Sequence, residues 1–495
     1  DMDVYVAALR IPDLIFNLLI LGTLSVAFIP VFVGYVKRDS PETSVIASTI
    51  FNITLLVMIF FVTAGIIFAP ILIKVIAPGF SMEAAASAIA MTRILLLSPL
   101  LFSLSSILTS ILHSYKRFLV AAIAPLLYNL SIIFGAIYVY PKFGLSGLAW
   151  TVVLGAFLHM LLQLPLSLKL GLRPLRFLDI HHEGVKKIAK LFLPRILALD
   201  LGQISLLIAT VIGSALTVGS LSGFYYAFEL ETVPVGIFAM SFAIASFPTM
   251  AEFFEKNDIV GFKRFFSVTT VQILFFIIPI SVLMLLLRAQ IVRLVPGAIE
   301  GTRFTFADTA LTASSLGFFV LSLFAQSLVP LLARAFFAFQ NTITPLIISS
   351  IAAVINITAA IFLSRQFGSA GLAMAFSIAS IVQMVILVAA LRRRLGDLED
   401  DFVILRVLKI SIASVLMAIV AYLTLYAVAP LVDMQTYLGV LIQTLSAIVV
   451  AVFVYLMSGR VIGLPETHQT IEIIKIWFNK LSRPITSAIV SMFDP

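Results

Sequence analysis

The sequence Phe-Gly-Leu-Ser-Gly-Leu-Ala at residues 143–149 recurs as Phe-Gly-Ser-Ala-Gly-Leu-Ala at residues 367–373. Each copy follows a Pro-Leu pair, at 125–126 and at 345–346. Farther upstream, Tyr5 to Pro12 and then Pro30 are echoed by Tyr226 to Pro234 and then Pro248. All these matches keep an offset of roughly 220 residues, which indicates an internal structural repeat.

The composition around this repeat is that of a membrane protein. The chain has 495 residues, of which 61% are hydrophobic and 11% are charged, and its mean hydropathy is +1.15. Soluble domains are about 45–50% apolar and about 25% charged. Apolar runs of about 20 residues, the length that spans a bilayer, recur along the whole chain. We therefore predict an all-α polytopic membrane protein.

Polar residues, prolines and glycines interrupt the apolar runs and divide the chain into about 13 predicted transmembrane helices. The predicted spans are 4–36, 46–77, 87–112, 118–140, 146–168, 188–214, 222–251, 265–287, 312–338, 343–364, 369–391, 405–430 and 436–459. The basic connections fall on alternate loops, with about 21 Lys and Arg on one side against about 6 on the other, as the positive-inside rule requires. This distribution predicts an outside N-terminus and a cytoplasmic C-terminus.

The repeat offset contains six spans, so both copies have the same orientation in the membrane. We predict two parallel-repeat helical lobes around a central cavity, followed by two extra C-terminal helices. The predicted parts are an N-lobe at 1–170, a cytoplasmic inter-lobe loop at 171–185, a C-lobe at 186–395, two additional helices at 396–462 and an amphipathic cytoplasmic tail at 463–495. The span at 188–214 has no counterpart before Tyr5, so we expect a first helix to be missing.

Several function classes are disfavoured. The chain has no cysteine, which excludes a disulfide framework and a thiolate metal site. The net charge of +8 comes from basic residues scattered between spans, so nucleic-acid binding is not expected. No Walker A, HExxH or Gly-x-Ser-x-Gly motif is present, so we expect no enzyme, no metal site and no cofactor.

The sequence resembles the MurJ/MviN family of lipid II flippases, within the larger group that includes MATE exporters. The resemblance lies in the segments 3–12, 22–30, 77–80, 147–150, 163–165, 203–205 and 225–234. It implies two six-helix lobes plus two C-terminal helices, with the first helix absent here. It also implies transport of the undecaprenyl-pyrophosphate-linked peptidoglycan precursor from the inner to the outer leaflet by alternating access.

The sequence departs from the family pattern at several charged positions. Phe16 and Asn17 stand where two adjacent family arginines are usual, and Glu229 replaces a further arginine. Ala209 and Ala360 correspond to carboxylates that are proposed to bind sodium in some members. The scaffold therefore carries over better than the substrate site, and the coupling ion stays unknown.

The candidate substrate-binding residues are polar groups in or near the spans, where charge is costly unless it is paired or functional. They are Asp3, Arg10, Asn17, Arg93, Asp200, Glu229 and Arg334. Arg10 is interpreted either as a phosphate-facing cavity residue or as an interfacial cation paired with Asp3 or Asp13. Arg93 and Arg334 face the cavity or make interfacial or interhelical pairs.

Two other functions remain open beside a lipid II flippase. One is export of another lipid-linked oligosaccharide or a small molecule, and the other is a degenerate MviN-like membrane scaffold. In the flippase interpretation, the partners are the lipid-linked precursor and membrane lipids. The protein is then a monomer in the bacterial inner membrane.

The C-terminal tail has apolar residues at helical spacing, namely Ile471, Ile474, Trp477, Phe478 and Leu481. Lys475 and Lys480 lie between them, which favours an amphipathic helix on the cytoplasmic surface. A disordered tail is the alternative.

Overall fold

The computed structural model describes residues 2–19, 24–38, 42–196, 201–295, 305–472 and 475–476. Over these residues the chain forms α-helices joined by short π, 3-10 and loop segments, and it contains no strand. The prediction of an all-α fold is confirmed. The chain divides into two compact units, Asp1–Leu221 (unit 1) and Ser222–Pro495 (unit 2).

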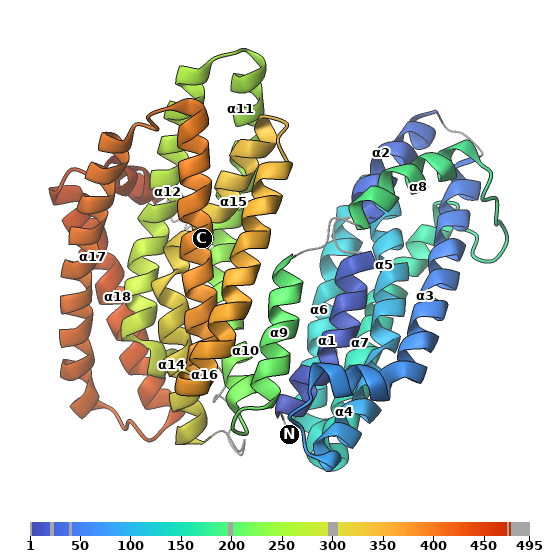
Figure 1. Cartoon of the computed structure of the whole chain (residues 1–495), viewed down its shortest axis with the longest axis horizontal. Helices are drawn as coiled ribbons and strands as arrows, with labels where there is room; N and C mark the ends of the chain where they lie inside the picture. Colours follow the sequence, from blue (N-terminus) through green and yellow to red (C-terminus); the bar gives the residue numbers. More distant parts are fainter. Residues whose placement is uncertain are drawn as a thin grey trace, which may run out of the picture. The chain divides into compact units, whose positions relative to one another are not determined.

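Unit 1 is a bundle of helices in which α9 packs against α1 and α3 (Figure 1). Its elements are α1 (Met2–Leu19), α2 (Leu24–Lys37), α3 (Glu42–Ile76), α4 (Met82–Leu95), α5 (Leu97–Ser114), α6 (Phe118–Phe134), η1 (Gly135–Val139), α7 (Tyr140–Lys169), α8 (Glu183–Ile196) and α9 (Leu201–Ser214).

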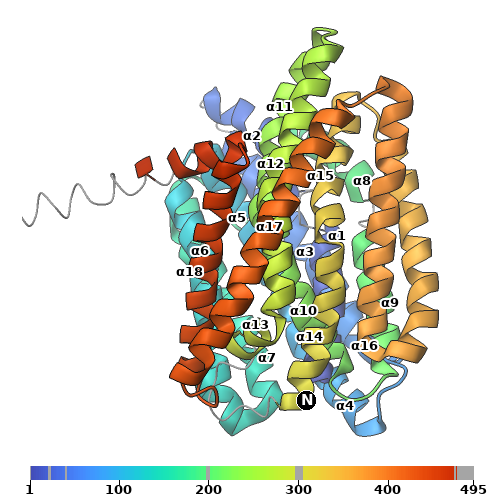
Figure 2. The same ribbon diagram turned by 90° about the vertical axis from the view of Figure 1, so that its left-hand side faces the viewer.

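Unit 2 begins within α10, and its late helices α17 and α18 pack side by side (Figure 2). Its elements are α10 (Ser220–Pro234), η2 (Val235–Met240), α11 (Ser241–Glu255), α12 (Ile259–Leu286), α13 (Arg288–Leu294), α14 (Phe306–Leu321), α15 (Leu323–Ala338), α16 (Ile343–Leu395), α17 (Asp400–Val428), η3 (Ala429–Leu431) and α18 (Tyr437–Val461).

Both units contain the repeated glycine that the sequence singled out. In α7, Gly144 has φ 61° and ψ −155°, and in α16, Gly368 has φ 58° and ψ −134°. Only glycine adopts this region of backbone conformation readily. These residues kink helical runs of 52 and 53 residues, which are far too long for a single crossing of a bilayer about 30 Å thick.

A second shared feature is a helix that is broken near its middle. In unit 1 the break lies at Leu96, between α4 and α5, and in unit 2 it lies at Ser322, between α14 and α15, where the helices bend by 47°.

The two broken pairs also start with side-chain caps. The Ser81 hydroxyl accepts from the Ala84 N–H, and Thr305 forms a capping box with Asp308. These caps satisfy N–H groups that the first helical turn leaves without partners.

The described residues contain 8 helices long and apolar enough to cross a membrane, or up to 9 if the bent pair α14–α15 is one span. The chain is thus a multi-pass membrane protein. The number of 13 stays a prediction, because the two kinked runs are each counted once and the predicted spans at 4–36 and 188–214 include residues outside the described ranges.

The basic connections of unit 1 gather at one end of its bundle. There α3 holds the loop after α7 through neutral hydrogen bonds. Asn52 Nδ2 donates to the Phe177 carbonyl at 2.7 Å, and its Oδ1 accepts from the Leu175 N–H at 3.0 Å. Ser48 and Thr49 also accept from backbone N–H groups of this loop. The loop is thereby fixed beside the start of α3.

The equivalent end of unit 2 is joined by charged side chains. Arg264 on α12 pairs with Glu399 at 2.8 Å, and Arg392 pairs with Asp400 across the turn between α16 and α17. The Arg394 guanidinium lies 4.5 Å from the centroid of the Phe339 ring. The additional helix α17 also packs along α12 through a buried cluster that includes Phe275 and Met417.

Candidate functional site

Arg10 lies on α1 of unit 1, and its side chain is only 13% exposed. Its Nε donates to the Val6 carbonyl at 3.5 Å, and its Nη2 lies 3.7 Å from Oδ2 of Asp13. A guanidinium in a membrane-spanning bundle is costly unless it is paired or binds an anion. Arg10 is therefore paired with Asp13 at 3.7 Å, and a guanidinium is also the side-chain group that best matches the oxygens of a phosphate.

An aromatic contact series leads from α1 to the interior of unit 1. The Phe16 ring lies 5.5 Å from the Phe102 ring on α5, measured between centroids. Phe102 in turn contacts Tyr128 on α6 at 4.9 Å and His159 on α7 at 5.3 Å. The half-buried Asn17 follows Phe16 on α1. The positions where the family resemblance led us to expect arginines thus lie near a membrane-embedded histidine.

His159 belongs to a hydrogen-bonded network between α5 and α7. Its Nδ1 is 2.7 Å from Ser105 Oγ, which accepts from Gln163 Nε2 at 2.8 Å. Thr109 Oγ1 donates to Gln163 Oε1 at 2.7 Å. All these distances are ordinary for hydrogen bonds. The network therefore fixes the side chain of His159 between α5 and α7.

The other predicted residues of unit 1 have separate surroundings. The Asp3 carboxylate accepts from the Gly219 N–H at 2.7 Å, which connects α1 to the loop before α10. Arg93 is exposed on α4, and its Nε donates to the Ile66 carbonyl of α3 at 3.3 Å. Asp200 lies outside the described residues. Of the predicted set in unit 1, Asp3, Arg10 and Asn17 share α1 with Phe16, and Asn17 directly follows Phe16 in the chain.

In unit 2, the predicted Glu229 is exposed on α10, whereas Glu231, two residues later, is 0% exposed. Two residues rotate a helix by about 200°, so these carboxylates point in nearly opposite directions. Arg334 is half-buried on α15 and donates from Nη1 to the Pro330 carbonyl at 3.2 Å. No described contact joins Glu229 to Arg334.

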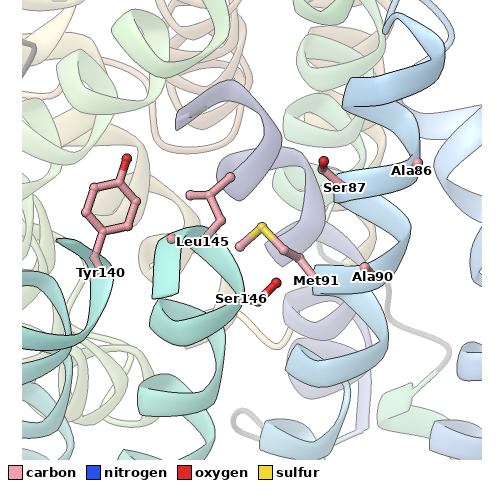
Figure 3. Close-up of a pocket in the computed structure, with 8 residues that line it drawn as sticks. Ala86, Ser87, Ala90, Met91, Tyr140, Leu145 and Ser146 are labelled. Atoms are coloured by element: carbon pink, nitrogen blue, oxygen red, sulfur yellow. The ribbon is translucent and has the colours of Figure 1, made fainter. Parts of the chain in front are cut away.

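A cavity of about 470 Å³ opens in unit 1 where α4 meets the Gly144 kink of α7 (Figure 3). Its lining is Ala86, Ser87, Ala90 and Met91 from α4, and Tyr140, Gly144, Leu145 and Ser146 from α7. Small side chains and the bend of the backbone leave this space. None of the predicted site residues lines it. Its polar groups are hydroxyls, so it offers no charge for an anionic substrate.

Two functional candidates were not predicted from the sequence, although it contains a signal for each. His159 and Gln163 are four residues apart in an otherwise apolar helix, which places them on one face. Glu231 follows Phe224 and Phe228 at the spacing of a buried helical stripe. In both cases the periodicity of burial indicates that the polar group faces inward.

The family model described as lipid II flippase MurJ matches residues 1–443. A relative from Buchnera aphidicola, described as a probable lipid II flippase MurJ, is 28% identical over 470 residues, which are 93% of this chain and 91% of the relative. The lipid II flippase MurJ of Burkholderia cenocepacia is 27% identical over 403 residues, covering 79% of this chain and 77% of its own.

Solved structures agree with these sequence relatives. The structure of a lipid II flippase MurJ in an inward closed conformation superposes with a TM-score of 0.74 at 25% identity, covering 93% of this chain and 92% of that one. An inward-facing MATE family multidrug transporter superposes with a TM-score of 0.65 at 16% identity, covering 80% of this chain and 92% of that one, and shows the shared fold alone. With a family model matched over most of its length, the chain belongs to the MurJ family of multi-pass membrane proteins.

Proposed function

We propose that this protein is a flippase that carries lipid II, the undecaprenyl-pyrophosphate-linked peptidoglycan precursor, from the inner to the outer leaflet. The match of the MurJ family model to residues 1–443 carries this proposal. The chain also has the apolar helices that such transport needs, and both units repeat the same kinked and broken helices. Two related units of this kind suit an alternating-access transporter.

The head group of such a substrate is the part that hydrocarbon excludes. Arg10 is our candidate for contact with its diphosphate, because its guanidinium is largely buried in a span of unit 1 and guanidinium groups bind phosphate oxygens in a bidentate way. Asn17 adjoins Phe16 on the same helix, and the ring contacts of Phe16 and Phe102 lead from α1 to His159, so both are further polar candidates in unit 1. Asp3, by contrast, is occupied by the Gly219 N–H, which favours a structural role.

The rest of the proposal follows from this function and from the charge of the loops. The protein resides in the bacterial inner membrane as a monomer, with its C-terminus in the cytoplasm, and its partners are the lipid-linked precursor and membrane lipids. It transports its substrate without catalysing a covalent reaction, and it does not bind nucleic acid. The concentration of basic loops on one side supports this orientation.

Complementation tests the proposal directly. The chain is expressed in a bacterium whose own lipid II flippase can be depleted, and growth is followed together with exposure of lipid II at the outer leaflet. We expect both to be restored. Normal membrane levels of the protein with neither growth nor lipid II exposure would contradict the proposal.

Arg10→Gln and Arg10→Lys refine the test of the site. A diphosphate contact predicts that the Gln variant loses most of its flipping rate and that the Lys variant keeps part of it, because Lys retains the charge but not the bidentate geometry. Arg93→Gln is the matched control, since Arg93 is exposed and bonded to a backbone carbonyl. Equal losses of flipping rate in Arg10→Gln and Arg93→Gln would show that Arg10 is not a specific diphosphate contact.

A further inference from the structure

Glu231 is the buried carboxylate of the α10 span. Its residue is 0% exposed, and neither Oε1 nor Oε2 has a hydrogen-bond partner within the described part of the chain. It lies in the candidate membrane span Ser220–Glu255. Carboxylates in such spans are rare, and they either pair or take part in ion movement.

Aromatic side chains precede Glu231 on the buried stripe of α10. Phe224 and Phe228 lie on the same stripe of α10, and both contact Phe319 of α14, with centroid distances of 5.3 and 5.8 Å. Phe228 also contacts Phe376 of α16 at 5.7 Å. These rings pack α10 against α14 and α16, and Glu231 on the same stripe is fully buried.

Gln326 on α15 is the neighbouring polar side chain. Its Nε2 already donates to Ser322 Oγ at 2.9 Å, and Ser322 donates to Ser377 Oγ at 2.9 Å. A single amide offers at most one further N–H to a carboxylate that has about four lone-pair sites. Gln326 therefore leaves the carboxyl group of Glu231 largely unsatisfied.

No cation compensates Glu231 within the described residues. The charged groups on the elements packed against α10 are Asp308 on α14, Arg334 on α15, and Arg365 and Arg392 to Arg394 on α16. None of them pairs with Glu231. Arg334 lies two turns beyond Gln326, about 12 Å along the helix axis. Glu229, its nearest acidic neighbour in sequence, is exposed on another face of α10.

An ionised carboxylate in these surroundings would be a buried, uncompensated charge, which costs several kcal/mol. We propose that Glu231 is a proton-binding site of unit 2, with its carboxyl group protonated while α10 is packed against α14 and α15 as in this structure. The group takes up a proton as this packing forms and releases the proton to water when the packing opens. This proposal goes beyond lipid II transport and does not depend on the identity of the substrate.

A metal ion is the less favoured occupant. The described residues contain no group of three or more His, Cys, Asp or Glu side chains placed to hold a metal ion. One carboxylate and one amide leave a metal ion far short of the oxygen ligands it needs in a dry site. A proton needs only the carboxylate itself.

Infrared difference spectroscopy on the purified full chain in lipid nanodiscs, without substrate, tests the protonation. At neutral pH we expect a carboxylic-acid C=O band that shifts in heavy water and disappears in Glu231→Gln. Glu252→Gln is the matched control, because Glu252 is on the same span with its side chain 61% exposed and paired with Lys256. The control should keep the band.

Glu231→Asp guards against an effect of misfolding, since it retains a carboxyl group and should keep the acid band at an altered frequency. Loss of a carboxylate band instead of an acid band in Glu231→Gln would overturn the proposal. A sodium-dependent carboxylate band at this residue would overturn it as well, in favour of a metal ion. Failure of complementation would leave this measurement unaffected, so the two proposals fail separately.

Discussion

Units 1 and 2 share a helical plan but differ in the polar groups that they bury. In unit 1, Ser105, His159 and Gln163 form a network in which the donors and acceptors match. In unit 2, Gln326 and Ser322 form a similar pair, yet within the described residues Glu231 beside them has no compensating cation and at most the Gln326 amide reaches its carboxyl group. A repeated fold therefore does not imply repeated chemistry, because buried polar groups depend on individual side chains rather than on the backbone plan.

The two units also differ at the ends that carry their basic loops. Unit 1 uses neutral hydrogen bonds from α3, chiefly those of Asn52. Unit 2 uses partly exposed ion pairs such as Arg264 with Glu399. Neutral buried bonds are insensitive to salt, whereas exposed ion pairs weaken as salt screens them.

The largest expected effect tests what the units share. Gly144→Ala and Gly368→Ala should each lower the free energy of unfolding by about 2–3 kcal/mol, because alanine is strained in this backbone region. Reversible unfolding in mixed micelles measures the change. Gly34→Ala in unit 1 and Gly236→Ala in unit 2 are matched controls, since both positions have open space and no positive φ. If only one of the two glycine variants lowered the free energy of unfolding, the two kinks would not be equivalent.

The next effect tests the hydrogen-bonded network of Ser105, His159 and Gln163 in unit 1. Gln163→Leu should lower the free energy of unfolding by about 1–2 kcal/mol, because Thr109 and Ser105 lose an interhelical partner. The same unfolding measurement applies, with Gln435→Leu in the exposed turn before α18 as the control. Equal stability of the two variants would show that the hydrogen bonds of Gln163 do not stabilise unit 1.

A smaller effect separates the loop-bearing ends of the units. Arg264→Gln should lower the free energy of unfolding by only about 0–1 kcal/mol, and this loss should shrink at high salt. Asn52→Leu should cost more and should be unaffected by salt. The two variants are compared by unfolding at low and high ionic strength. A salt-sensitive loss in Asn52→Leu would remove the contrast.

The smallest effect is expected for Glu231→Gln at about pH 4, where the carboxyl group is largely protonated in both the packed and the unfolded chain and a glutamine of nearly the same shape replaces it. The difference should grow as the pH rises from about 4 to neutral, because the unfolded wild-type chain then loses a proton that the packed unit retains, and the variant has no such group. Melting temperatures in nanodiscs between acidic and neutral pH measure it. Parallel curves for the two proteins would contradict a protonated Glu231.

Some of the site was predictable and some was not. Arg10 was identified because a cation in an apolar span is conspicuous in any sequence, but its pairing with Asp13 was one of several alternatives. His159 was missed although Gln163 lies four residues away, since a spacing shows that two residues share a face and not what that face contacts. Glu229 was chosen over Glu231 because the resemblance pointed to it, while helical rotation buries the other carboxylate.

The sequence by itself determined the membrane class and the internal repeat, which contains the two glycines at which the structure kinks its helices. Hydropathy and backbone freedom are local properties, so they can be read from the residues alone. Only the tertiary structure decided which polar side chains are satisfied. The free energy of a buried carboxylate or imidazole depends on groups from other helices, such as Gln326 beside Glu231 and Ser105 beside His159, and chain order does not specify those neighbours.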